Sequence, residues 1–157
     1  MKLKIMLAAV AAVALAIPLV ATAGSGTDRA TGGGQVLIGT RGGAGDTIAF
    51  TAQDRATNLG QIQYIDRTAI GQTRYHGTVL CVDIMGNTAL IAGTWRNQGD
   101  GNFNLYVEDN EQGANALESD MIFIEETADN PTCDFDEPDE QDQLALARGN
   151  VQVYDAQ

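Results

Sequence analysis

Few residues in this sequence could act as nucleophiles or general bases. The chain has two serines, Ser25 and Ser119, and neither lies in the G-x-S-x-G motif of a serine hydrolase. His76 is the only histidine, and it stands five residues before Cys81 on one predicted strand. An odd spacing places two side chains on opposite faces of a strand, so a Cys-His nucleophile pair is not expected.

The segment 107–120, VEDNEQGANALESD, contains carboxylates and amides that could bind a metal ion. Asp109, Glu111 and Asp120 fall at positions 1, 3 and 12 of an EF-hand loop, and Asn110 adds an amide oxygen. The glycine stands at the fifth position rather than the sixth, and strands are predicted on both sides, so this is no EF-hand. Two alternatives remain: a calcium site of another kind, or a turn whose side chains cap backbone groups. No other cofactor is predicted.

Trp95, the sole tryptophan, could anchor the core or present an exposed ring to a ligand. It shares a strand face with Ala89, Ile91 and Gly93, which favours the core. An exposed indole would instead stack on a sugar or another ring. Paired carboxylates could support glycoside hydrolysis, but the 21 acidic residues offer many pairs, and only a separation measured in a cleft identifies a catalytic one. No residue is therefore assigned a catalytic role.

The elements that position these residues are predicted to be β-strands. Apolar and polar residues alternate in short segments between glycine-rich turns, a pattern typical of all-β domains. In the longest segment, Tyr75, Val79 and Cys81 are expected on one face, and Gly86-Asn87 predicts a tight hairpin turn after it. Candidate strands cover residues 34–39, 46–53, 59–66, 74–85, 88–95, 102–109, 121–125 and 149–155.

About eight strands in one short chain predict a compact antiparallel β-barrel or β-sandwich. The only candidate helix, residues 142–149, spans barely two turns and could equally be a loop. Cys81 and Cys133 are expected to form one disulfide. A metal or redox role is disfavoured, because the sequence has no C-x-x-C motif and two thiolates with one histidine do not complete a zinc site.

The N-terminus predicts export. Lys2 and Lys4 precede an apolar run, and the small residues Ala21-Thr22-Ala23 follow it. This is the pattern of a secretory signal peptide, residues 1–23, cleaved after Ala23. We expect the protein to be secreted, periplasmic or at the cell surface, where disulfides persist.

Cleavage would leave a flexible N-terminus, residues 24–33, and a single all-β domain, residues 34–157. Nothing in this mature chain is long and apolar enough to span a bilayer as a helix. Residues 134–143, DFDEPDEQDQ, predict an exposed acidic loop tethered at its base by the disulfide.

The mature chain would contain seven arginines, 21 acidic residues and no lysine, for a net charge of about −14. Nucleic acids and anionic membranes are therefore poor partners. The absence of lysine excludes Schiff-base chemistry. The remaining partners are cations, basic molecules or other extracellular or envelope partners, and self-association would follow if the sheet left its edges unpaired.

Five features occur in order between residues 30 and 154: ATGGGQ, YHGTVLCVDIMGNTALIAGT, VEDNEQGANALESDMIFI, the second cysteine and GNVQVY. Together they resemble the post-COAP domain, a small domain of exported bacterial proteins. The resemblance implies an exported all-β module without a transferable enzymatic activity. We therefore expect a noncatalytic surface, structural or adhesion module; the alternatives are a small-ligand or carbohydrate-binding barrel and, less favoured, a carboxylate-dependent hydrolase.

Overall fold

The computed structural model describes residues 27–36, 45–57, 59–68, 71–97, 101–110, 120–140 and 142–156. The predicted signal peptide lies outside this part of the chain. Within the described ranges, no helix has the length and apolar character needed to cross a membrane.

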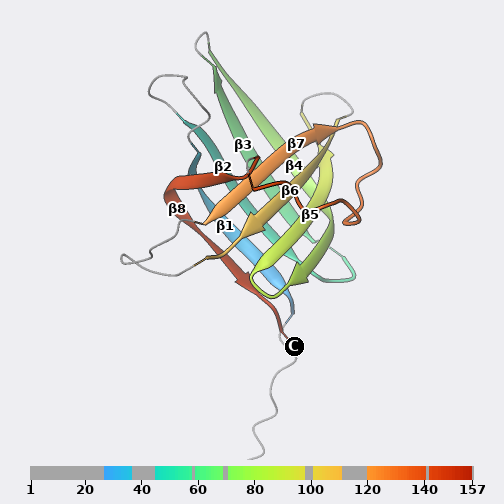
Figure 1. The fold of residues 1–157 in the computed structure, drawn as a ribbon. Helices are drawn as coiled ribbons and strands as arrows, with labels where there is room; N and C mark the ends of the chain where they lie inside the picture. Colours follow the sequence, from blue (N-terminus) through green and yellow to red (C-terminus); the bar gives the residue numbers. More distant parts are fainter. Residues whose placement is uncertain are drawn as a thin grey trace, which may run out of the picture.

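Eight antiparallel strands form one closed barrel in sequence order, with β8 returning to pair with β1 (Figure 1). Of the two predicted architectures, the barrel is therefore the one observed. We call the end at which β3 ends and β4 begins the upper end, as drawn in Figure 1. The strands are β1 (Arg29–Val36), β2 (Asp46–Gln53), β3 (Gly60–Thr68), β4 (Gly71–Met85), β5 (Thr88–Trp95), β6 (Asn102–Glu108), β7 (Met121–Thr127) and β8 (Leu144–Tyr154).

Apolar and polar residues alternate along the strands because successive side chains point to the inside and the outside of the barrel. β2 and β5 occupy the predicted residues, 46–53 and 88–95. Ile48 and Phe50 of β2 are buried in the core, whereas Ala49 and Thr51 are exposed. The turn between β4 and β5 contains Gly86 with a φ of 64°, as the hairpin signal predicted.

The glycine-rich strand β1 begins at Arg29, five residues earlier than predicted. The expectation of a flexible N-terminus is therefore wrong for residues 29–33. A Cβ atom at Gly34 would lie 2.1 Å from the carbonyl oxygen of Arg148 on β8. One at Gly33 would lie 2.7 Å from the carbonyl oxygen of Ile48 on β2. The glycine run resembles a loop in composition, but here it lets β1 pack closely between two neighbours.

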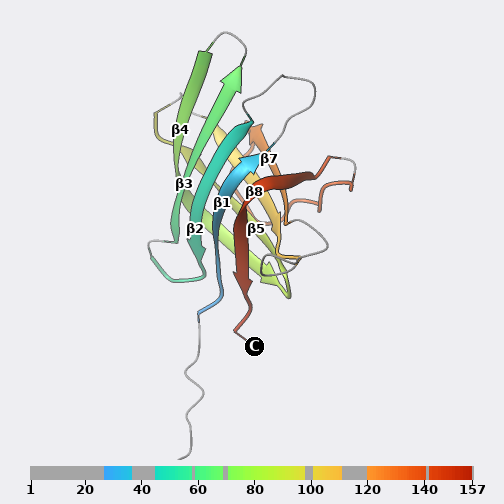
Figure 2. The ribbon, with the colours of Figure 1, turned by 90° about the vertical axis from the view of Figure 1, so that its left-hand side faces the viewer.

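Residues 144–154 form β8, so the helix or loop expected for residues 142–149 is wrong. The apolar residues Leu144 and Leu146 pack on the barrel core rather than on a helix face. β8 changes direction along its length (Figure 2), and Gly149 has a φ of 121°, a conformation that favours glycine. Among the described residues, β8 pairs with β7 at only two positions, which leaves a short seam in the barrel wall.

A β-bulge in β4 changes which residues face inward. Between Val79 and Cys81 the pairing advances two residues on β4 but one on β5, so Leu80 is the extra residue. Val79 is buried before the bulge, and Val82 packs on the core after it. The prediction of one continuous inner face is therefore wrong beyond Val79, and Cys81 lies on the outer side with His76.

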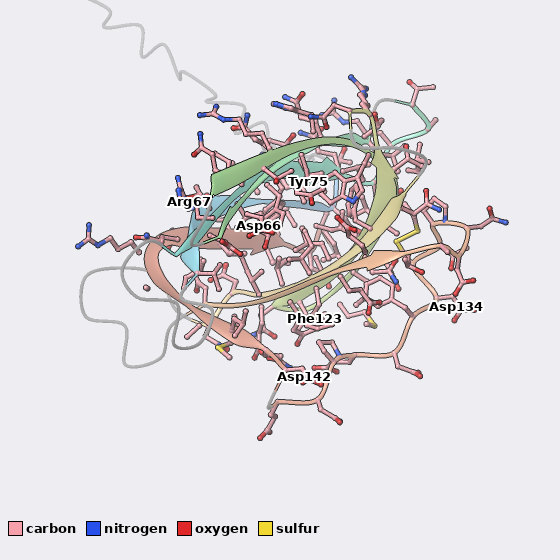
Figure 3. The ribbon with its side chains drawn as sticks, turned by 90° about the horizontal axis from the view of Figure 1, so that it is seen from above. Asp66, Arg67, Tyr75, Phe123, Asp134 and Asp142 are labelled. Carbon is pink, nitrogen blue, oxygen red and sulfur yellow. A yellow bond between two sulfur atoms is a disulfide. The ribbon has the colours of Figure 1, made fainter. Side chains whose placement is uncertain are left out.

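The disulfide between Cys81 and Cys133 is present, with Cα atoms 5.7 Å apart. It fastens the segment between β7 and β8 to the outside of the barrel. Figure 3 shows Asp134 and Asp142 of this segment outside the ring of strands, and both are exposed. Beneath the segment, the outward-facing Tyr106 of β6 is only 1% exposed. The acidic loop thus forms a partial outer layer as well as an exposed surface.

Gly93 on β5 leaves room for the ring of Phe103. A Cβ atom at Gly93 would lie 2.1 Å from the carbonyl oxygen of Thr78 and 2.6 Å from Phe103 Cζ. We expect Gly93→Ala to lower the free energy of unfolding by about 2 kcal/mol, because backbone and ring must both shift. Urea denaturation measures the loss. Gly71→Ala is the control, since a Cβ there would meet no described atom within 4 Å; equal losses in the two variants would contradict the packing explanation.

Candidate functional site

A row of aromatic side chains crosses the inside of the barrel near its upper end. Tyr64, Tyr75, Trp95 and Phe103 come from β3, β4, β5 and β6 in that order. The ring centroids are 5.8, 5.2 and 4.6 Å apart along the row. These separations are typical of favourable aromatic contacts. Glycine at position 77, like Gly93, makes the row possible, because a Cβ atom there would lie 2.7 Å from Phe103 Cε1.

An open pocket of about 260 Å³ lies beside this row, and three acidic residues contribute to its wall. Asp66 comes from the end of β3, and the two glutamates come from the end of β7. Figure 3 shows Asp66 and Tyr75 inside the ring of strands. None of the described lining residues is basic, so the pocket is both aromatic and acidic. Its aromatic and acidic residues are Tyr64, Asp66, Tyr75, Trp95, Glu125 and Glu126.

Hydrogen bonds hold Tyr64 at one side of the pocket. Its hydroxyl donates to Asp46 Oδ2 at 2.6 Å, and the backbone N–H of Arg67 donates to Asp46 Oδ1 at 2.7 Å. Asp46 is only 4% exposed. Burial, and then the hydrogen bond to Asp46, raises the pKa of Tyr64 above its ordinary value. Tyr64 is therefore a protonated, fixed donor at neutral pH.

Tyr75 of β4 and Glu126 of β7 both line the pocket. Burial, and then the charge of Glu126, raises the pKa of Tyr75. Glu125 accepts a hydrogen bond from Asn104 Nδ2 at 3.0 Å. Glu125 lies opposite Asn104 on the outward face of β7, which leaves Asp66 and Glu126 as the acidic residues directed inward.

Two buried polar atoms at the pocket have no hydrogen-bond partner in the described structure: Asp66 Oδ1 and Trp95 Nε1. One is an acceptor and the other is a donor. Leaving such atoms unpaired costs on the order of 1–3 kcal/mol each. Unpaired buried polar groups are rare in folded proteins, so this pair is the strongest sign of a binding site in the described residues.

Trp95 is 5% exposed and lies between Tyr75 and Phe103. It is therefore a core residue, which is the first of the two roles predicted from the sequence. The exposed ring expected in the alternative role is not present, because neighbouring rings contact the indole. Trp95 lines the pocket, and its indole N–H has no hydrogen-bond partner in the described chain.

Asp109 and Asp120 lie at the seam between β8 and the ends of β6 and β7. Asp120 Oδ2 accepts a hydrogen bond from the backbone N–H of Val151 at 2.6 Å, and Asp109 Oδ2 accepts one from Val153 at 3.0 Å. The N–H of Asn110 donates to Asp120 Oδ1 at 3.3 Å. These contacts correspond to the capping alternative.

The calcium hypothesis for the same segment finds no cluster among the described residues. No group of three or more histidine, cysteine or acidic residues in this part of the chain could hold a metal ion. Glu111 lies outside the described residues, so the full predicted set of Asp109, Asn110, Glu111 and Asp120 remains a prediction.

The candidate nucleophiles stay apart from the pocket. His76 is exposed on the outer side of β4, and Cys81 is oxidised in the disulfide. Both side chains face outward, contrary to the sequence-based expectation of opposite faces, because of the bulge at Leu80. The oxidised Cys81 has no thiol to pair with His76. Ser25 and Ser119 lie outside the described residues.

The raised pKa values predict a loss of stability at alkaline pH. Burial is the largest cause for both Tyr64 and Tyr106, followed by their hydrogen bonds to Asp46 and Glu137. The unfolded chain ionises these phenols near pH 10, whereas the folded protein keeps them protonated to higher pH. Their stabilisation is complete below pH 10, and above it each phenol should cost about 1.4 kcal/mol per pH unit.

Urea denaturation at several pH values between 9 and 11.5 tests this loss. The free energy of unfolding of Tyr64→Phe should fall less steeply with pH than that of the wild-type protein, whatever its value at pH 8. If the free energy of unfolding fell equally steeply in both proteins, the raised pKa of Tyr64 would not explain the loss of stability.

Sequence reasoning identified Trp95 but missed Tyr64, Asp66, Tyr75 and Glu126. A signal was present in β3, where Ile62, Tyr64 and Asp66 alternate onto one face. A carboxylate after two apolar inward positions marks the point where the barrel interior opens. The signal for Glu126 was weaker, because residues 121–124, MIFI, are all apolar and hide the alternation.

Comparison with known proteins finds no matching protein family, no similar curated protein and no similar solved structure. The resemblance to the post-COAP domain therefore remains a prediction.

Proposed function

We propose that this protein is a noncatalytic small-ligand-binding β-barrel whose site is the aromatic and acidic pocket at the upper end. The proposal rests on one observation: Asp66 and Trp95 both line this open pocket, and each has a buried polar atom without a hydrogen-bond partner in the described chain. A ligand that satisfies both atoms would remove their desolvation cost. Ligand pockets commonly combine aromatic walls with a few polar groups in this way.

Export supports an extracellular or periplasmic setting for this binding. The sequence pattern of residues 1–23 is that of a signal peptide, and the disulfide suits an oxidising compartment. The pocket lies where β3 and β7 end, so a ligand would enter from the upper end of the barrel.

Trp95 provides the test, because a sole tryptophan gives a single indole N–H signal in a proton–nitrogen correlation spectrum. A panel of small amines, sugars and carboxylic acids should contain at least one compound that shifts this signal saturably. Tyr75→Phe removes a hydroxyl from a residue that lines the pocket and should weaken the binding. Tyr154→Phe is the matched control, because Tyr154 is an exposed residue that does not line this pocket. A panel without any saturable shift would overturn the proposal.

A noncatalytic surface or adhesion module is the second candidate. Asp134, Asp136, Asp139, Glu140 and Asp142 are all exposed on the segment that the disulfide holds against the outer wall. This surface suits a basic partner. Binding of a basic protein that survives Asp66→Asn but disappears when these five acids become amides would favour this candidate. Hydrolysis of aryl glycosides, abolished by Asp66→Asn, would instead support the hydrolase alternative.

A further inference from the structure

We propose that the ligand of this pocket is a small protonated amine that also has an oxygen acceptor; the inference rests on the proposed function.

The charge of the lining selects a cation. Asp66 and Glu126 stand at inward-facing strand positions and contribute two carboxylates, whereas Glu125 lies on the outward face. No described lining residue is basic to offset the two carboxylates. An anionic ligand would be repelled. A neutral ligand would leave the carboxylates without a counter-charge in a partly enclosed site. A cation is attracted both by the carboxylates and by aromatic rings.

The unpaired acceptor atom of Asp66 favours a cation that has N–H groups. Asp66 Oδ1 is an acceptor and is itself buried, so it needs a donor from the ligand. A protonated amine offers N–H donors, whereas a quaternary ammonium offers only charge. Hydrogen bonds between charged partners are stronger than those between neutral ones. Asp66 should therefore discriminate between these two kinds of cation.

The indole specifies the second ligand group. Trp95 is 95% buried, and its Nε1 can only donate. A ligand oxygen, such as a hydroxyl or a carboxylate, would accept this bond. Stacking of a sugar on Trp95 is disfavoured because Tyr75 and Phe103 already contact the ring, with centroids 5.2 and 4.6 Å away. The pocket volume of about 260 Å³ suits a compact molecule.

Three probes of nearly the same shape separate charge from hydrogen bonding. N,N-dimethylethanolamine is a protonated amine with one N–H, choline is a cation without N–H, and 3,3-dimethylbutan-1-ol is neutral. All three have a hydroxyl acceptor. We expect the amine to bind with a Kd of about 1 mM or below, measured by titration of the Trp95 indole signal. Choline should bind less tightly than the amine, and the neutral alcohol about tenfold or more less tightly.

Variants locate the effect in the pocket. Asp66→Asn should reduce the preference for the amine over the neutral alcohol to about threefold or less. Asp134→Asn removes the same charge from the exposed segment and should leave the preference unchanged. Glu126→Gln removes a negative charge from a lining residue and should reduce the affinity of both cations. It also provides a second test if Asp66→Asn folds poorly.

The outcomes distinguish the inference from the proposed function. Equal binding of the amine and the neutral alcohol, or binding only of neutral or anionic compounds, would overturn the amine assignment and leave the pocket a ligand site. No saturable shift with these probes or with any compound of the wider panel would overturn both.

Discussion

Removal of the disulfide should lower the free energy of unfolding by about 4 kcal/mol. In the chain-entropy description, a cross-link between residues 52 apart in sequence removes that much freedom from the unfolded chain. The bond also holds Glu137 near Tyr106, whose hydroxyl donates to Glu137 Oε1 at 2.7 Å. Cys81→Ser with Cys133→Ser would therefore lose both the constraint on the unfolded chain and an anchor of the outer layer.

Thermal unfolding of the double variant measures the effect, and a decrease of roughly 12 °C corresponds to this loss of free energy. Both cysteines must be changed together, because a single substitution leaves a thiol that can form mixed disulfides. Limited proteolysis adds a structural readout: cleavage should appear first between residues 128 and 140, where the bond holds the segment on the barrel wall. A variant that unfolds at the wild-type temperature would show that the loop entropy is offset elsewhere.

The strands were predictable from the sequence where apolar and polar side chains alternate. Prediction failed where glycines have no side chains to alternate, or where a bulge changes the alternation. Residues 46–53 and 88–95 have side chains that report their burial directly, so their bounds were predicted correctly. The glycines of β1 have no side chains to alternate, and their role is visible only once β2 and β8 lie beside them. The bulge at Leu80 has no clear sequence signal, because it depends on the register with β5.

The candidate site was less predictable than the fold, since its residues come from several strands. Asp66 and Glu126 are separated by 60 residues and meet at one pocket because β3 and β7 end at the same rim. The sequence contains 21 acidic residues, and composition cannot select the few that line a pocket. The opposite holds for Cys81 and Cys133, where there were two candidates and one possible pair.

Asp120→Ala should lower the free energy of unfolding by about 3 kcal/mol. Most of this loss should come from contacts at the seam between β7 and β8. β7 and β8 pair at only two positions in the described chain, so side chains replace missing backbone pairs beyond them. Asp120 is 7% exposed, and Val151, whose N–H it accepts, is 0% exposed. Without the carboxylate this donor is buried and unpaired, a cost of on the order of 1–3 kcal/mol, and the bond from Asn110 is lost as well.

Urea denaturation of Asp120→Ala, compared with Asp134→Ala, separates the seam contacts from the loss of a negative charge. Asp134 is exposed, so its replacement should change stability by no more than about 0.5 kcal/mol. Asp120→Asn should fall between the two, because its amide oxygen can still accept from Val151 while its NH₂ group faces a second donor. Both variants should be measured in chelator and in millimolar calcium. A loss of stability that appears only with calcium would make Asp120 a metal ligand. An equal loss in both solutions would show that Asp120 stabilises the seam as a hydrogen-bond acceptor.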